Sequence, residues 1–182
     1  MPDPTPDWLP PETWQVGDTL DAATMNKRIR DQMTTLLRRP LTVLTNTATQ
    51  SIAHGTNTTI TWDTITQDDD GMAMSGTPVS NIYAQREGTY QFWLNLTFAS
   101  NGAASPTLLS SIWISNSSTL RRWDHQSKTP ATADQVRCSS GTIFLNAGEY
   151  FTAHTYQDSG LAMSTKIISN TPSLIVMWLG VQ

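Results

Sequence analysis

The sequence predicts a mainly β protein, an antiparallel jelly-roll sandwich preceded by an extended arm and one amphipathic α-helix. Two observations carry this prediction. Apolar residues recur every three or four positions before Pro40, whereas after it they recur every second position. Short turn sequences rich in Gly, Asn and Asp then divide the rest of the chain into many short strands. We therefore expect residues 1–40 to form an attachment segment and residues 41–182 to form a β head.

Composition limits the classes of function. A chain of 182 residues holds one sizeable domain with an appendage, and only 14% of its residues are charged, with a net charge of −4. Nucleic-acid partners are not expected, because phosphates are bound by a basic face. The longest apolar run, residues 174–179, is too short to span a bilayer. The first residues lack the pattern of a secretory signal, so we expect a soluble protein made in the cytoplasm.

The first residues form a proline-rich arm that contains two tryptophans, Trp8 and Trp14. Proline at this density holds the backbone extended and cannot build a core alone. Two exposed indole rings are unfavourable without a surface that covers them. We expect the arm to lie on another protein, and the alternative is that both tryptophans pack on the chain's own helix.

The helix is expected to begin near Asp21, whose carboxylate can cap the first turn, and to end at Pro40. One apolar stripe follows this helix: Ala22, Met25, Ile29, Met33 and Leu36. A single stripe on an isolated helix needs a partner, which can be further copies of the helix, the β head or another protein. The basic residues of the segment are expected to form its solvated face: Lys27, Arg28, Arg30, Arg38 and Arg39.

The clearest strand of the head runs from Tyr90 to Phe98, where apolar and more polar residues alternate. The other expected strands are residues 41–48, 57–62, 79–85, 108–115, 135–145, 150–157, 163–168 and 173–181. The last of them is unusual because both of its faces are apolar. One face of a sandwich sheet should meet water, so the second apolar face predicts neighbouring subunits, most simply a ring of three.

The expected interface of this homotrimer consists of Tyr90, Phe92, Ile175, Met177 and Leu179. The alternative is a central strand that lies beneath a long loop of the same chain. That alternative explains the two apolar faces without any partner subunit.

Candidate chemistry is sparse. Asp68, Asp69 and Asp70 can hold a calcium ion, but adjacent side chains do not converge easily, so a solvated turn is the favoured interpretation. The histidines His54, His125 and His154 lack the spacing of a zinc site, although one of them near a threefold axis would meet its own copies. The lone Cys138 is interpreted as a buried small apolar residue. Motifs for catalysis are missing, so we expect no enzyme, cofactor or metal.

Part of the head resembles a known family. Residues 84–98 begin with AQREGTYQF, residues 145–150 read LNAGEY, residues 156–160 read YQDSG, and residues 173–180 close the pattern. In this order they resemble the trimeric jelly roll of tumour necrosis factors and complement globular heads. The resemblance covers residues 41–182 and implies a homotrimer.

The attachment segment has a resemblance of its own. Residues 14–18, WQVGD, and residues 20–31, LDAATMNKRIRD, resemble the opening of small virion proteins of tailed phages that infect actinobacteria. This resemblance covers residues 8–39 and implies a virion protein made in a bacterial host, with the arm on the particle and the head at its surface. The expected anchoring residues are Trp8, Trp14, Met25, Ile29 and Met33. The resemblance leaves attachment to the capsid or to the tail open.

Two functions follow. The first is a trimeric capsid decoration or head fibre that stabilises and covers the shell. The alternative is a minor tail or tail-fibre protein whose head binds host surface glycans through a site composed of Trp113, Trp123, Tyr156 and Arg121. Depolymerisation of host polymers ranks last, because a chain of this length leaves little room for a catalytic groove.

Overall fold

The computed structural model describes residues 21–30, 33, 37, 39–73, 78–100, 102, 107–115, 120–128, 135–168 and 172–180. The chain divides into two compact units, Met1–Pro40 and Leu41–Gln182. The division falls at the position where the apolar period of the sequence changes. Among the described helical residues, no segment is long and apolar enough to cross a membrane.

The N-terminal unit contains helical residues. α1 (Ala22–Met25) continues into the π-helical segment η1 (Asn26–Arg30), and Met33 and Leu37 are also helical. Ile29, Met33 and Leu37 expose 45%, 56% and 81% of their side chains. The proline-rich arm with Trp8 and Trp14 lies outside the described residues, so the arm and one continuous helix up to Pro40 stay predictions.

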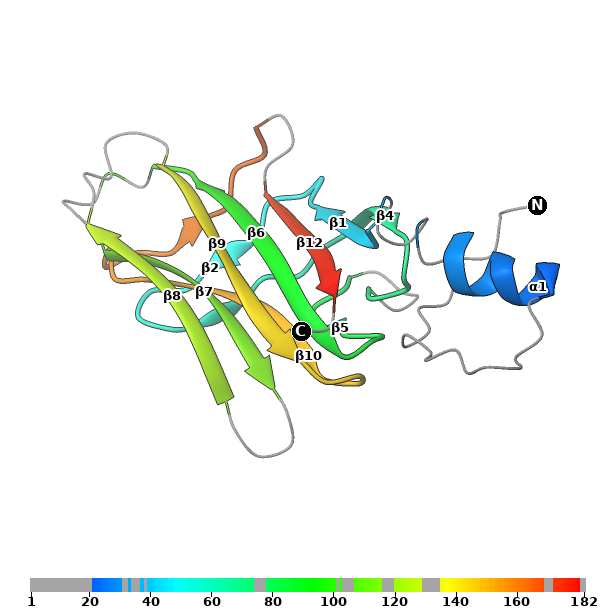
Figure 1. Cartoon of the computed structure of the whole chain (residues 1–182). Helices are drawn as coiled ribbons and strands as arrows, with labels where there is room; N and C mark the ends of the chain where they lie inside the picture. Colours follow the sequence, from blue (N-terminus) through cyan, green and yellow to red (C-terminus); the bar gives the residue numbers. More distant parts are fainter. Residues whose placement is uncertain are drawn as a thin grey trace. The chain divides into compact units, whose positions relative to one another are not determined.

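The head is mainly β, and all pairs of its named strands are antiparallel. The first sheet has the order β4-β1-β12-β6-β9 (Figure 1). Its strands are β1 (Leu41–Thr45), β4 (Thr64–Asp68), β6 (Gly88–Phe98), β9 (Gln135–Leu145) and β12 (Ser173–Gly180). The first and last strands of the head are therefore direct neighbours within one sheet.

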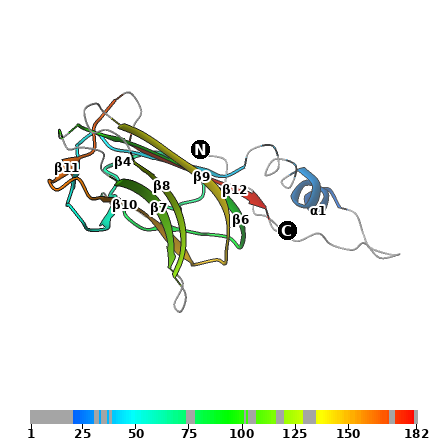
Figure 2. The same cartoon turned by 90° about the vertical axis from the view of Figure 1, so that its left-hand side faces the viewer.

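The second sheet has the order β3-β10-β7-β8, and β5 also pairs with β10. Its strands are β3 (Thr58–Thr59), β5 (Ile82–Tyr83), β7 (Thr107–Ser115), β8 (Leu120–Lys128) and β10 (Tyr150–Gln157). A small third sheet pairs β2 (Ser51–Ile52) with β11 (Met163–Ser164). The view in Figure 2 shows β7, β8 and β10 as one layer beside the layer of β6, β9 and β12.

The core lies between the two sheets and follows from strand alternation. On β6, Tyr90, Phe92 and Leu94 are buried while Gln91 and Trp93 are only half-buried, so the alternation predicted from the sequence is confirmed. The second sheet adds buried side chains from β7 and β10: Leu108, Ile112, Ile114, Phe151 and Ala153. Burial of such side chains stabilises each by about 1.5–3 kcal/mol relative to exposure, which makes this layer the main stabilising element of the head.

One polar contact joins the two layers. The hydroxyls of Ser110 on β7 and Ser139 on β9 lie 2.6 Å apart and are buried. Because each hydroxyl is a partner for the other, both can be buried without the cost of an unsatisfied polar group. The contact links β7 of the second sheet to β9 of the first.

Most strands were predicted from the sequence, and β9 and β10 have the predicted ranges. The prediction missed β2, β4 and β8. Of these, β8 has the sequence LRRWDHQSK, which is polar at both parities and therefore shows no apolar alternation. Both β4 and β8 stand at the ends of their sheets.

Candidate interaction surfaces

The outward face of the first sheet carries a strip of apolar side chains that crosses three strands. Val43 of β1 pairs with Ile175 of β12, which in turn pairs with Trp93 of β6. Leu41 is paired with Met177 in the same way. These side chains are half-buried within one chain. Directly opposed residues on one face of a sheet are in contact, so the strip is continuous.

The predicted trimer interface divides between two faces of this sheet. Ile175, Met177 and Leu179 lie on the outward face and are half-buried, so they are accessible to another subunit. Tyr90 and Phe92 are 0% and 1% exposed in the core of a single chain. Their assignment to an interface was wrong, because the long alternating strand turns its most apolar face toward the second sheet.

The outward apolar strip contains residues that the sequence did not single out, among them Leu41, Val43 and Trp93. Phe144 on β9 adds a side chain that is 40% exposed. In the sequence, Trp93 is an apolar residue among the alternate positions of β6 that are otherwise polar. Only the strand order, which places β1 and β6 on either side of β12, brings these residues together.

The outward face of the second sheet has a different character. Trp113 of β7 stacks on His154 of β10, with ring centroids 4.1 Å apart and planes 19° from parallel. Tyr83 of β5 meets Tyr150 of β10 with centroids 5.2 Å apart and planes tilted by 43°. All four side chains are half-buried. Aromatic rings and hydroxyl groups, rather than aliphatic chains, form this face.

The four residues predicted as a glycan site do not share one face. Trp113 and Tyr156 occupy the outward face of β7 and β10. Trp123 and Arg121 are paired with Ile112 and Ile114, two core residues. Paired positions share a face, so Trp123 and Arg121 belong to the opposite face of the sheet from Trp113. The error arose because β8 was not predicted as a strand, which left its register unknown.

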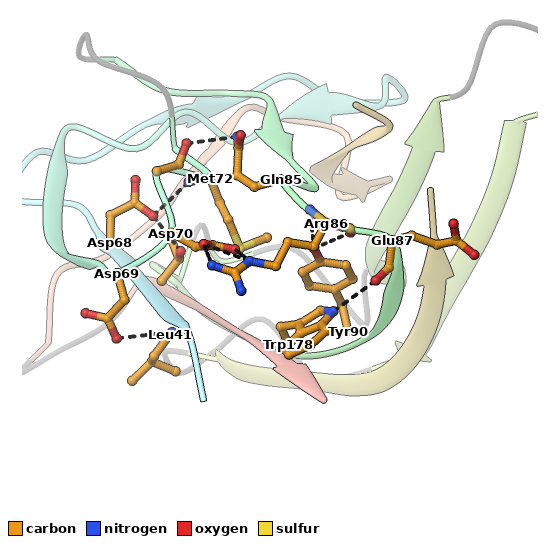
Figure 3. A network of polar contacts seen from close by, with 12 residues as sticks. Leu41, Asp68, Asp69, Asp70, Met72, Gln85, Arg86, Glu87, Tyr90 and Trp178 are labelled. Carbon is orange, nitrogen blue, oxygen red and sulfur yellow. Dashed lines mark hydrogen bonds and ion pairs between the residues drawn. The ribbon is translucent and has the colours of Figure 1, made fainter. Parts of the chain in front are cut away.

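The acidic run at the end of β4 forms a turn held by hydrogen bonds and an ion pair, whereas the sequence favoured a solvated turn: the Asp70 side chain is only 7% exposed. The Asp68 carboxylate accepts hydrogen bonds from the amides of Met72 and Ala73 at 2.9 and 3.0 Å. Asp69 accepts from the amide of Leu41 at 3.2 Å, and Asp70 forms an ion pair with Arg86 at 2.8 Å. Figure 3 shows these carboxylates pointing to different partners. No metal-binding cluster of His, Cys, Asp or Glu occurs among the described residues.

Arg86 is the centre of this network (Figure 3). Its guanidinium group forms a two-pronged contact with Asp70 and lies 5.7 Å from the ring centroid of Trp178. Burial raises the pKa of the Asp70 carboxyl, although the hydrogen bonds and charge of Arg86 oppose that rise. The contacts connect the turn after β4, the turn before β6 and the terminal strand β12.

Tyr90 and Gly88 complete the same end of the first sheet. The Tyr90 hydroxyl donates to the carbonyl of Arg86 at 2.7 Å, and burial raises the pKa of Tyr90 to about 12. Gly88 has φ 147°, and a β-carbon there would lie 2.5 Å from Nε1 of Trp178. Glycine is therefore required at this position by both backbone and space.

Cys138 is exposed, so its interpretation as a buried residue was wrong. It pairs with Asn95 on the outward face of the first sheet, while its neighbour Ser139 faces the core. Which of these two neighbours faces the core depends on whether the odd or the even positions of β9 point inward. The sequence of this region has no strong apolar alternation from which to predict this. His54 lies between β2 and β3, and His154 lies on β10. His125 lies on β8, opposite Ser110 of β7.

Comparisons with known proteins support the fold alone. No protein-family model matches the chain, and no characterised protein sequence matches it. The globular domain of zebrafish complement 1qA protein is similar in structure, with a TM-score of 0.58, 8% identity, and coverage of 79% of this chain and 100% of that chain. Murine APRIL at pH 5.0 gives a TM-score of 0.58 with 14% identity, covering 78% of this chain and 100% of that chain.

A third neighbour is the Eiger TNF of S. frugiperda, with a TM-score of 0.51 and 13% identity, covering 80% of this chain and 96% of that chain. At these identities the likeness describes how the backbone is arranged. The predicted fold is confirmed to that extent: the head has the jelly-roll fold of tumour-necrosis-factor and complement globular domains.

Proposed function

We propose that this chain is a phage virion structural protein whose heads form a homotrimer at the particle surface, anchored by the N-terminal segment. The observation that carries the proposal is the apolar strip of Val43, Ile175 and Trp93 on the outward face of the first sheet. A continuous apolar surface is unfavourable in water, and further copies of the same chain can cover it without a different partner protein. The trimeric jelly rolls that the head resembles support three copies.

The anchor is the second part of the proposal. Ile29, Met33 and Leu37 are large apolar side chains that the described residues leave exposed. An amphipathic helix of this kind is suited to an apolar groove of a partner protein. Trp8, Trp14 and Met25 are proposed to extend the contact. Three arms acting together multiply a modest single affinity, so attachment becomes effectively permanent.

The resemblance of residues 8–39 to small virion proteins supports a partner on a phage particle. Within that class we propose a capsid decoration or head fibre that stabilises and covers the shell. The low charge of the chain, 14%, suits a surface that presents uncharged polar groups. A minor tail protein is the alternative attachment site.

The copy number of this chain in purified particles tests the proposal. Quantitative mass spectrometry against the major capsid subunit should give an abundance comparable to that subunit for a shell decoration. A far lower count would place the protein on the tail or at a vertex. Absence from purified particles would contradict a virion role.

The anchor is tested by Met33→Asp, which places a charge in the exposed apolar stripe. We expect particle attachment to fall at least tenfold while the head keeps its melting temperature. Asn26→Asp adds the same charge at an exposed polar position of the helix and is the matched control. Equal attachment of both variants would contradict a role for the stripe.

A further inference from the structure

We propose that the outward face of the second sheet binds a neutral polysaccharide. This surface, the aromatic face, is formed by side chains of β5, β7 and β10: Tyr83, Trp113, Tyr150, His154 and Tyr156. It lies on the opposite side of the sandwich from the apolar strip. The inference does not depend on the trimer or on attachment to a particle.

Strand geometry arranges the rings as a row. Tyr150, Thr152, His154 and Tyr156 occupy alternate positions of β10 and are all half-buried. At about 3.3 Å per residue, Tyr150 and Tyr156 stand roughly 20 Å apart along the strand. Trp113 pairs with Thr152 and so stands beside the middle of the row. A surface of this length offers contacts to several consecutive sugar rings.

Hydrogen bonds hold these side chains in place before any ligand binds. The indole N–H of Trp113 donates to Ser111 Oγ at 2.8 Å. The ring nitrogens of His154 contact the hydroxyls of Thr152 at 2.8 Å and Thr59 at 3.4 Å. A ligand on a pre-ordered surface avoids the entropy cost of fixing each side chain.

The chemistry of this face favours carbohydrate. The C–H faces of a pyranose ring are apolar and carry slight positive charge, so they pack on the negative face of an aromatic ring. Sugar hydroxyls can exchange hydrogen bonds with the nearby Thr, Ser, Tyr and His groups.

Charge then selects a neutral polymer. The described side chains of the aromatic face carry no formal charge. β8 adds two cationic positions and one anionic position on this face: Arg122 opposite Trp113, Lys128 opposite Thr107 and Asp124 opposite Ser111. One net positive charge remains, whereas an acidic polysaccharide or a nucleic acid would require a cluster of cations. A protein partner is better matched by the apolar strip of the other sheet, because few aliphatic side chains occur here.

Soluble hexasaccharides test the proposal on the full-length protein by isothermal titration calorimetry. The probes are cellohexaose, maltohexaose and hexa-N-acetylchitohexaose as neutral ligands and hexagalacturonate as an acidic one. Binding of a soluble oligosaccharide is read per chain, so the result does not depend on whether the chain forms trimers. We expect at least one neutral probe to bind and the acidic probe not to bind.

Variants locate the binding. Tyr156→Ala and Trp113→Ala should each weaken the neutral probe at least tenfold, and Tyr156→Phe should separate loss of the ring from loss of the hydroxyl. Phe144→Ala removes an exposed ring from the first sheet and is the matched control, which should bind like the unmodified protein. Unchanged melting temperatures exclude general unfolding, and Tyr156→Phe still reports on the site where an alanine variant does not fold.

Three results would overturn the proposal: no binding of any neutral probe at millimolar concentration, binding of the acidic probe alone, or equal binding by Tyr156→Ala and the unmodified protein. A protein that binds the neutral probe but is absent from purified particles would support this inference while contradicting the proposed virion role.

Discussion

The two outward faces of the head differ in what their strands present. On the first sheet, aliphatic and indole side chains of β1, β12 and β6 are paired directly, as in Val43, Ile175 and Trp93. On the second sheet, rings alternate with hydroxyl groups that hydrogen-bond to them, as in Trp113 with Ser111. The inner faces of both sheets bury apolar side chains, and the second sheet also buries Ser110, Thr155 and Gln157. The two outward faces therefore suit different partners, whereas the inner faces build the common core of the fold.

The largest effect is expected for Ile175→Asp, which tests whether the two outward faces have separate roles. The substitution places a carboxylate in the centre of the apolar strip, where burial against another subunit would leave it without a charge partner. We expect the trimer mass, measured by size-exclusion chromatography with light scattering, to fall to that of a monomer at micromolar concentration. The aromatic face should keep its affinity for oligosaccharide.

The matched control is Thr142→Asp, which adds the same charge at an exposed position of β9 on the same face. The control should remain trimeric if the contact centres on β12. A monomeric unmodified protein, with and without residues 1–40, would contradict the trimer itself.

A smaller effect is expected at Gly88, which fixes the end of the first sheet. Gly88→Ala forces a methyl group against Trp178 and Gly180 in a backbone conformation that L-residues rarely adopt. The free energy of unfolding should fall by about 3 kcal/mol, from overpacking and backbone strain together. Urea unfolding measures the change.

Gly148→Ala is the control for that variant, because its φ of 84° is also positive but no atom lies within 4 Å of an added β-carbon. It should cost only the backbone strain, about 1 kcal/mol. Equal losses in the two variants would show that the contact with Trp178 contributes little.

Alkaline pH should weaken the first sheet through Tyr90. Burial raises the pKa of Tyr90 to about 12, above the ordinary value of 10.0. A phenol with a raised folded pKa contributes stability that is complete below pH 10 and is lost as pH rises from 10 through 12. The free energy of unfolding should therefore fall less steeply over this range in Tyr90→Phe than in the unmodified protein.

At pH 7, Tyr90→Phe should cost about 1 kcal/mol for the lost hydrogen bond to Arg86. Identical alkaline slopes in the Tyr90 variant and the unmodified protein would contradict the argument.

The smallest effect is expected at Asp63, beside the start of β4. Burial would raise the pKa of this carboxyl, but amide hydrogen bonds from Thr47 and Ala48 and the Thr64 hydroxyl lower it below 3.8. Its stabilising effect is therefore present above pH 3.8 and is lost as pH falls through the folded value.

Asp63→Asn should lower the free energy of unfolding by about 1 kcal/mol at pH 7 and should flatten its dependence on acid. Thermal unfolding from pH 2 to 7 measures both effects. A variant as stable as the unmodified protein at pH 7 would show that the carboxylate does not hold the turn.

The sequence predicted those strands that alternate strongly. β6, β9 and β10 were found because one parity of each strand is apolar or because clear turns bound it. β8 was missed because polar residues occupy both parities. The outward faces were less predictable, since Val43 and Ile175 are far apart in the chain and meet only through register. The assignment of Tyr90 failed because sequence gives the parity of a residue, but not which parity faces the core. The assignment of Trp123 failed because β8 was not predicted as a strand, so its register was unknown.

The order of the strands also sets when the outward face of the first sheet can exist. β12 follows β1 and β6 in the chain, and it inserts between them in the middle of the sheet. Until it does, Ile175 does not connect Val43 with Trp93, and the apolar strip is incomplete. Pairing across such long sequence separations forms slowly, so we expect this surface to appear late in the folding of the head.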